Sequence, residues 1–168
     1  MPDQKPINTN ANIFIIDDEP NVVSELKSFL AKADYENAHG FTDPVEAIET
    51  LQNMTPDLIV IDLKMPELGG RFLTKLIRDE QHLIETPIIA VITEEQESVA
   101  DYVAKYNVAE VVSKPIVEYD FIKAVSAAIA NHIDGVNQQL VDRLIERRIA
   151  QENFKMREKN VRAVFNRN

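Results

Sequence analysis

The stretch from Pro56 to Gly70 constrains the fold more than any other part of the sequence. It contains an uninterrupted aliphatic run, Leu58–Ile61, with Pro-Asp before it and Pro and Gly-Gly after it. A short apolar run bounded by turn residues is typical of a strand that is buried on both faces, as in parallel sheets covered by helices. Asp62 directly follows the run. We therefore expect Asp62 at the carboxyl end of a buried strand, where open α/β sheets bind ligands.

The rest of the chain repeats this alternation of strand and helix. Apolar runs and helical spacing predict strands over residues 12–16, 38–41, 58–62, 87–92 and 110–113, and helices over residues 20–33, 43–51, 70–83, 97–106 and 118–133. Strands that alternate with helices form a parallel sheet with helices on both faces. The predicted fold is therefore an α/β, doubly wound, five-stranded parallel sheet.

Composition excludes several classes of protein. The 168 residues suffice for one domain of ordinary size plus an extension. The absence of cysteine excludes disulfides, thiolate metal sites and thiol nucleophiles. No segment has the pattern of a signal peptide or the roughly 18 apolar residues of a membrane span. We expect a cytoplasmic protein with a disordered leader over 1–11, a globular domain over 12–134 and a helical extension over 135–168.

Charge is divided unevenly along the chain. The net charge is −10, and the segment from Gly135 onward has eight basic and four acidic residues, a net of +4, which leaves −14 on residues 1–134. Such an acidic body repels nucleic-acid phosphates. We therefore expect no direct binding of nucleic acid.

Polar residues follow four of the predicted strands: Asp17 and Asp18 the first, Asp62 the third, Thr93 the fourth and Lys114 the fifth. In a parallel sheet these strand ends meet at one edge, so the side chains are expected to converge. Three clustered carboxylates repel one another unless a cation neutralises them. Oxygen ligands favour Mg²⁺. The pattern predicts a magnesium site at this edge.

The same residues suggest a reaction. A carboxylate such as Asp62 can act as a nucleophile toward a phosphoryl group. The Thr93 hydroxyl and the Lys114 ammonium could stabilise the phosphoryl oxygens. A lone acid at a strand end is more often a turn former or a helix cap. The convergence of four strand ends favours the chemical interpretation.

These motifs together resemble a known family. Asp17-Asp18, Asp62-Leu-Lys-Met-Pro-Glu-Leu-Gly-Gly, Ile92-Thr93 and Ser113-Lys114-Pro115 look like the receiver domain of bacterial two-component response regulators, over about residues 12–133. The resemblance implies a flavodoxin-like fold that accepts a phosphoryl group from a histidine kinase or phosphotransfer protein. It also implies that the chain is no enzyme, but a phosphoacceptor with at most slow self-dephosphorylation.

The resemblance further implies a role for each matching residue. Asp62 would be the phosphoacceptor. Asp18 would bind Mg²⁺ directly, Asp17 would help through water, and the backbone carbonyl of Lys64 would complete the protein ligands. Thr93 and Lys114 would contact the phosphoryl group and report its presence to the face formed by the fourth helix, fifth strand and fifth helix. The bond before Pro115 would be cis.

Two positions depart from the family pattern. Val111 lies where such domains usually have a Tyr or Phe that acts as a rotameric switch, so an aromatic swing is no part of the output. Glu94 follows the threonine where a small residue is usual, and its bulk could narrow access to Asp62. Lys64 and Glu95 occupy positions that tune hydrolysis of the phosphoryl group. The alternative function is a non-phosphorylated pseudo-receiver that acts as a protein-interaction adaptor.

The segment 135–168 reads as a helix that is too short for an ordinary DNA-binding output domain. Gly135 either ends the preceding helix or is tolerated within a longer one, at a cost of about 1 kcal/mol. A near seven-residue rhythm is formed by Val136, Leu140, Leu144, Phe154, Val161 and Phe165, and is interrupted by Arg147, Gln151 and Glu158. The segment could form a dimerising coiled coil, a linker to a further output domain, or an amphipathic helix lying on an acidic surface.

Overall fold

The computed structural model describes residues 8–66, 68–93 and 99–165, with residues 152, 153 and 158–165 described only as backbone. The chain divides into two compact units, Met1–His132 and Ile133–Asn168. The first seven residues of the expected leader lie outside the described residues. Asn8–Asn10 form a turn and Ala11 is already buried. Across the described residues, no helix is both long and apolar enough to span a membrane.

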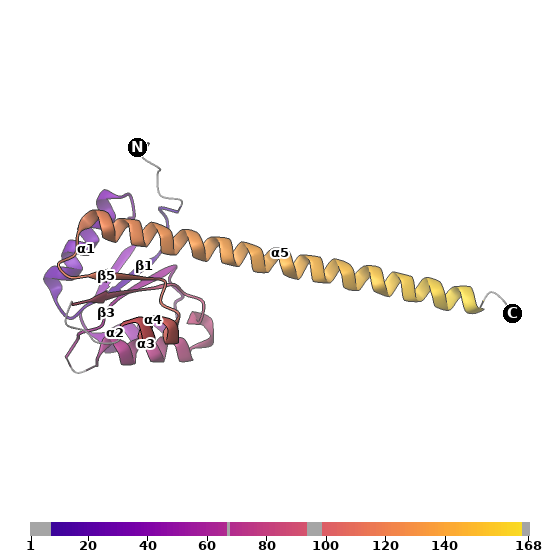
Figure 1. Ribbon diagram of the computed structural model, residues 1–168, viewed down its shortest axis with the longest axis horizontal. Helices are drawn as coiled ribbons and strands as arrows, with labels where there is room; N and C mark the ends of the chain where they lie inside the picture. Colours follow the sequence, from indigo (N-terminus) through magenta and orange to yellow (C-terminus); the bar gives the residue numbers. More distant parts are fainter. Residues whose placement is uncertain (1–7, 67, 94–98, 166–168) are drawn as a thin grey trace. The chain divides into compact units, whose positions relative to one another are not determined.

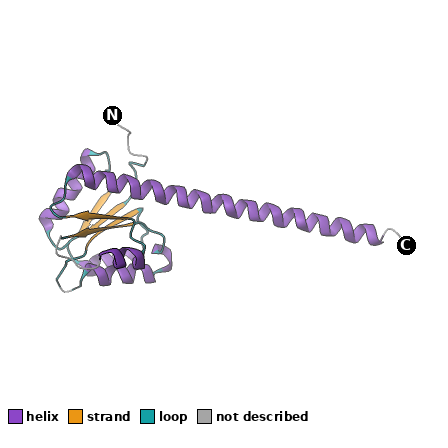
Figure 2. Ribbon diagram, viewed as in Figure 1, coloured by secondary structure: helices purple, strands orange, loops and turns teal. Residues whose placement is uncertain are grey.

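The first unit contains a parallel five-stranded sheet with the order β2-β1-β3-β4-β5. Figure 2 shows its strands in orange between purple helices. The elements in chain order are β1 (Ile13–Ile16), α1 (Pro20–Lys32), β2 (Ala38–Phe41), α2 (Pro44–Leu51), β3 (Leu58–Asp62), α3 (Gly70–Asp79), the short 3₁₀ helix η1 (Gln81–Leu83), β4 (Ile88–Ile92), α4 (Val99–Tyr106), β5 (Glu110–Ser113) and α5 (Glu118–Phe165). The predicted flavodoxin-like doubly wound fold, with its C-terminal helix, is confirmed.

Helices cover both faces of this sheet (Figure 1). α1 and the first turns of α5 lie on one face, where the rings of Phe29 and Phe121 are 6.4 Å apart and the Tyr35 hydroxyl is 3.3 Å from Ser126 Oγ. α2, α3 and α4 lie on the other face. The central strands β1 and β3 are buried along their whole length, which explains why both are apolar throughout except for Asp62 at the end of β3.

Helix ends follow local chemistry. Pro20 occupies the first position of α1, where its missing N–H costs nothing. The side chain of Asp43 caps α2 by accepting a hydrogen bond of 2.8 Å from the Val45 N–H. Asn107 adopts a left-handed conformation (φ 48°) directly after α4, as the sequence predicts.

One predicted helix is divided in the structure, and another continues beyond its predicted end. The helix predicted over 70–83 is divided, because Glu80 has extended backbone angles (φ −83°, ψ 118°) that separate α3 from η1. The start predicted near Glu97 lies outside the described residues, and the described part of α4 begins at Val99. α5 continues through Gly135, so the glycine is tolerated rather than terminating.

Arg78 joins four backbone carbonyls from separate segments. Its guanidinium donates to the carbonyl oxygens of Tyr106 (2.8 Å) and Asn107 (3.2 Å) at the end of α4. It also donates to those of Leu83 (3.0 Å) and Thr86 (2.9 Å) before β4. A cation suits a helix C-terminus, where carbonyls lack helical partners. This one side chain on α3 therefore fixes the ends of two neighbouring elements.

A buried hydrogen bond links α3 to α4. Thr74 Oγ1 lies 2.6 Å from the Tyr102 hydroxyl, and it also donates to the Gly70 carbonyl oxygen at 2.8 Å. Thr74 and Tyr102 are 0% and 2% exposed, so water cannot replace this bond. Burial raises the pKa of Tyr102 above its ordinary value.

This burial predicts that the Tyr102 hydroxyl ionises at a higher pH than an ordinary tyrosine. The difference in ultraviolet titration between wild type and Tyr102→Phe should show a group that ionises above the ordinary tyrosine pKa of about 10. Because the folded pKa is raised, the stability that Tyr102 contributes is complete below the unfolded pKa and is lost as the pH rises through the folded value. Tyr119→Phe is the control, since that side chain is 74% exposed. A Tyr102 signal at or below the ordinary pKa would contradict the prediction.

Candidate functional site

The topology brings the chemically active residues to one edge of the sheet. The strand order reverses at β1, which connects to β2 on one side and pairs with β3 on the other, and this opens a crevice at the carboxyl ends. Asp17 and Asp18 follow β1, and Asp62 is the last residue of β3. Thr93 follows β4 and Lys114 follows β5. These five of the six predicted site residues thus lie at the same edge, and the sixth, Lys64, follows Asp62 by two positions.

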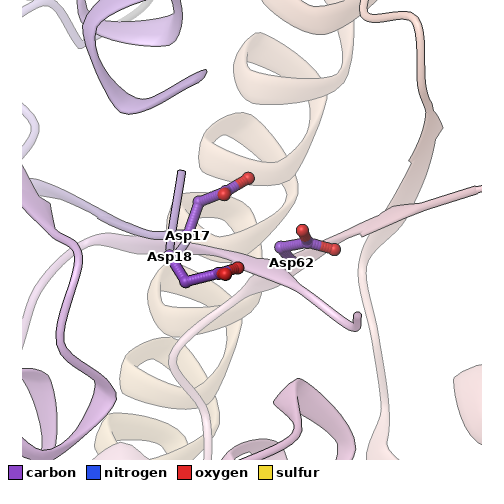
Figure 3. A group of neighbouring side chains, drawn as sticks. All are labelled: Asp17, Asp18 and Asp62. Atoms are coloured by element: carbon purple, nitrogen blue, oxygen red, sulfur yellow. The ribbon is translucent and has the colours of Figure 1, made fainter. Parts of the chain in front are cut away.

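The three aspartates form a compact acidic cluster. Asp17, Asp18 and Asp62 each offer a carboxylate oxygen, and these oxygens all lie within 4.8 Å of one another. Figure 3 shows Asp17 and Asp18 extending from the end of β1 on the side where Asp62 lies. Asp17 and Asp62 are 1% and 2% exposed. The clustering that the sequence predicts is therefore present, with two of the acids buried.

Lys114 provides the positive charge opposite this cluster. Its ammonium lies 2.8 Å from Asp62 Oδ2, 3.1 Å from Glu19 Oε1 and 3.2 Å from Asp17 Oδ2. Burial alone would lower the pKa of Lys114, but the hydrogen bonds to Asp62 and Glu19 and the charge of Asp17 raise it above its ordinary value. Lys114 is therefore a permanent cation at this site. The Lys114–Pro115 peptide bond is cis, as expected.

Asp17 has an oxygen that suits a cation. Oδ1 accepts a hydrogen bond of 2.9 Å from the Glu19 N–H. Oδ2 is buried and lacks a hydrogen-bond partner among the described residues, so the nearby Lys114 pairs with it by charge only. Burial raises the pKa of Asp17, and the Asp62 carboxylate adds to this rise. An oxygen-only cluster with such an atom fits a hard divalent ion such as Mg²⁺.

Asp62 is held by a donor at each oxygen. Oδ1 accepts a hydrogen bond of 2.9 Å from the Lys64 N–H, and Oδ2 accepts from Lys114. α3 begins so close to this strand end that a Cβ added to Gly70 would overlap the Asp62 backbone carbonyl oxygen. The two hydrogen bonds fix the orientation of the carboxylate and leave each oxygen a further lone pair.

Two further positions singled out in the sequence, Thr93 and Val111, are also described by the structure. Thr93 Oγ1 is buried without a hydrogen-bond partner in the described part of the chain, so its hydroxyl is able to donate to a ligand. Val111 is half-buried against the apolar cluster under α3 and α4. Glu94 and Glu95, which the sequence places beside Thr93, lie outside the described residues.

Sequence reasoning missed two contributors. Glu19 appears in the sequence only as a third acid before a helix, yet its carboxylate bonds Lys114 at 3.1 Å. Gly70 appears only as a turn residue, yet its lack of a side chain permits the close approach to Asp62. The position of Glu19 directly after Asp18 is the sequence signal that could have identified it as a site residue. Nothing in the sequence reports how closely α3 approaches β3.

Comparison with known proteins agrees with this geometry. The family model of the response regulator receiver domain matches residues 13–126, more than half of the chain. Protein PilH of Pseudomonas aeruginosa is 24% identical over 71% of this chain and 98% of its own length. A protein-glutamate methylesterase/protein-glutamine glutaminase of Oleidesulfovibrio alaskensis is 27% identical over 81% of this chain, which spans only 38% of that relative.

Solved structures share the fold. The chemotaxis response regulator CheY4 of Vibrio cholerae has a TM-score of 0.65 at 23% identity, covering 71% of this chain and 98% of its own. A response regulator from Chloroflexus aurantiacus has a TM-score of 0.66 at 21% identity, covering 72% of this chain and 98% of its own. With the family match and the converging strand ends, these findings identify the chain as a member of the response regulator receiver domain family.

Proposed function

We propose that this protein is a cytoplasmic, phosphorylation-dependent switch of a two-component system, with Asp62 as the phosphoacceptor. One observation carries the proposal: a buried carboxylate at a strand end is bonded by a lysine ammonium and surrounded by two further acids. The donor would be a histidine kinase or a phosphotransfer protein. The chain acts as the acceptor and not as an independent enzyme, apart from slow self-dephosphorylation.

The transfer is a nucleophilic substitution at phosphorus. An Asp62 carboxylate oxygen attacks, an O–P bond forms, and the P–N bond to the donor imidazole breaks with its electron pair leaving on nitrogen. The Lys114 ammonium and the Thr93 hydroxyl stabilise the charge on the phosphoryl oxygens. The Lys64 N–H holds the carboxylate in place, at 2.9 Å from Oδ1. The product is an acyl phosphate on Asp62.

A magnesium ion belongs to this proposal. Asp18 and Asp62 would bind it directly, Asp17 would act through water, and the Lys64 carbonyl would be the remaining protein ligand. The ion would neutralise charge on the phosphoryl oxygens. The close carboxylate oxygens support this assignment, as does the buried Oδ2 of Asp17, which has an ion pair with Lys114 but no hydrogen-bond partner among the described residues.

The helix beyond residue 132 is proposed as the means of output. It would pass the signal to a downstream domain or protein and join two copies of the chain as a homodimer. Its large apolar side chains are about half exposed in the described part of the extension, which supports a partner there. A swing of an aromatic residue at position 111 is no part of this output, because that residue is valine.

The test is incubation with a small phosphodonor and Mg²⁺, followed by intact-mass measurement. Wild-type protein should gain one phosphoryl group, and Asp62→Asn should gain none because the nucleophilic oxygen is lost. Asp79→Asn, an exposed acid on α3, is the matched control and should be phosphorylated like wild type.

The same experiment tests the pseudo-receiver adaptor. That alternative rests on Val111 and on Glu94 beside Thr93. If the wild-type chain gains no mass from small phosphodonors or from a phosphorylated donor protein, the phosphoacceptor function is wrong and the adaptor function is retained. Mass gain retained in Asp62→Asn would overturn the assignment of the residue.

A further inference from the structure

The described part of the extension presents large apolar side chains that are about half exposed. In the described part of this unit Leu140 and Leu144 are each 55% exposed and Phe154 is 63% exposed. Val136, Val141, Ile145 and Ile149 are also about half exposed. Most helical stability in proteins comes from packing an apolar face against another surface. This helix therefore needs a partner surface.

One face of the helix carries a regular seam. Positions 140, 144, 147, 151, 154, 158, 161 and 165 are alternately four and three residues apart, which is the spacing of a coiled-coil interface. Leu140, Leu144 and Arg147 share a face, because residues three and four positions apart are neighbours on a helix surface. For residues 158–165 the seam positions follow from the sequence and the continuing helix.

The order of residues along this seam is complementary when it is read backwards, except at the mixed central pair of Gln151 and Phe154. Pairs that are symmetric about the point between residues 152 and 153 are Leu140 with Phe165, Leu144 with Val161, Arg147 with Glu158, and Gln151 with Phe154. Apolar residues thus meet apolar residues in the outer layers, and the only basic seam residue meets the only acidic one. A two-fold interface requires this kind of complementarity.

The geometry points to an antiparallel coiled coil between two copies of this chain, with Arg147 of each copy paired with Glu158 of the other. The inference rests on the homodimer part of the proposed function and adds its orientation and register. A parallel, in-register pair would place Arg147 against Arg147 and Glu158 against Glu158. Like charges facing each other across an interface disfavour that arrangement.

The distribution of net charge supports the same orientation. The segment from Gly135 onward carries +4, and residues 1–134 carry −14. In an antiparallel pair the C-terminal half of each helix lies toward the end at which the other helix joins its acidic unit. In a parallel pair the two basic ends would lie together. Charge attraction therefore adds to the complementarity of the seam.

Charge reversal on the full-length protein tests the pairing. Arg147→Glu and Glu158→Arg, measured singly by analytical ultracentrifugation, should each raise the dimer dissociation constant by about tenfold or more, because each creates like-charge contacts. The double variant restores opposite charges and should return to within about threefold of wild type. Asp142→Arg, an exposed position on the side of the helix opposite the seam, should change little. Equal weakening in the single and double variants would overturn the antiparallel register.

Introduced cysteines test the orientation directly, because the natural chain has none. A Leu144→Cys chain mixed with a Val161→Cys chain should form a mixed disulfide on mild oxidation. Leu144→Cys alone should form few disulfide-linked dimers, since the two copies of position 144 are far apart in an antiparallel pair. Efficient crosslinking of Leu144→Cys to itself would establish a parallel dimer and overturn the inference.

Failure of the inference can be told apart from failure of the proposed function. A parallel dimer contradicts only the orientation and leaves the homodimer in place. A protein that remains monomeric at all concentrations overturns the inference together with the homodimer. Neither result bears on the proposed role of Asp62 as phosphoacceptor, which the mass measurement on Asp62→Asn tests separately. Circular dichroism of each variant confirms that the helix is retained.

Discussion

Replacing Lys114 with methionine should slow phosphorylation of Asp62 by small phosphodonors by about 100-fold, because loss of one preorganised charge-stabilising donor typically costs about 100-fold to 1000-fold in rate. The ammonium is 2.8 Å from the Asp62 oxygen, where charge on the phosphoryl group would develop. Methionine keeps the length and the apolar stem of the side chain and removes only the charge and its donors. The rate of mass gain under saturating Mg²⁺ measures the effect.

The same variant should bind Mg²⁺ more tightly, by about tenfold. Lys114 now neutralises part of the charge of Asp17, Asp62 and Glu19. Without it the carboxylate cluster is more negative and attracts a divalent ion more strongly. The opposite signs of the two effects separate a role in charge stabilisation from simple damage to the site, which would weaken both.

Lys32→Met is the control for this pair of measurements. Lys32 forms an exposed ion pair of 2.9 Å with Glu118, on a different part of the domain. Its loss removes the same formal charge and should leave both the phosphorylation rate and the Mg²⁺ affinity close to wild type. Lys114→Met protein that is phosphorylated at the wild-type rate would refute the role given to Lys114.

Replacing Arg78 with methionine should lower the free energy of unfolding by about 3 kcal/mol. Four carbonyl oxygens, at the end of α4 and before β4, would lose their charged donor. Each hydrogen bond to a charged group contributes about 1.5–3 kcal/mol, and water can replace part of that loss at this half-buried position. Urea denaturation monitored by circular dichroism measures the change.

Lys75→Met on the same helix is the matched control for Arg78. Lys75 is exposed, so its replacement should change stability by less than about 0.5 kcal/mol. Arg78→Lys is a second comparison, because a single ammonium cannot reproduce a planar guanidinium that serves four acceptors. If Arg78→Met and Lys75→Met were equally stable, the four carbonyl contacts would be energetically unimportant.

Much of the fold could be predicted because the strands are short and continuously apolar. Leu58–Ile61 and Ile88–Val91 are buried on both faces, and that burial dictates their composition. The division of the third helix at Glu80 could not be predicted, because apolar spacing continues through Leu83. Arg78 anchors this region through contacts with segments that are distant in sequence.

The chain order by itself determined that Asp17, Asp18, Asp62, Thr93 and Lys114 follow parallel strands, and parallel strands place their carboxyl ends at one edge. Only the tertiary structure decided that Lys114 is shared by three carboxylates, that Glu19 is one of them, and that α3 contacts the backbone of Asp62. The reason is physical. Local sequence fixes where each strand ends, whereas distances between side chains on different strands depend on strand order, sheet twist and the packing of helices above them.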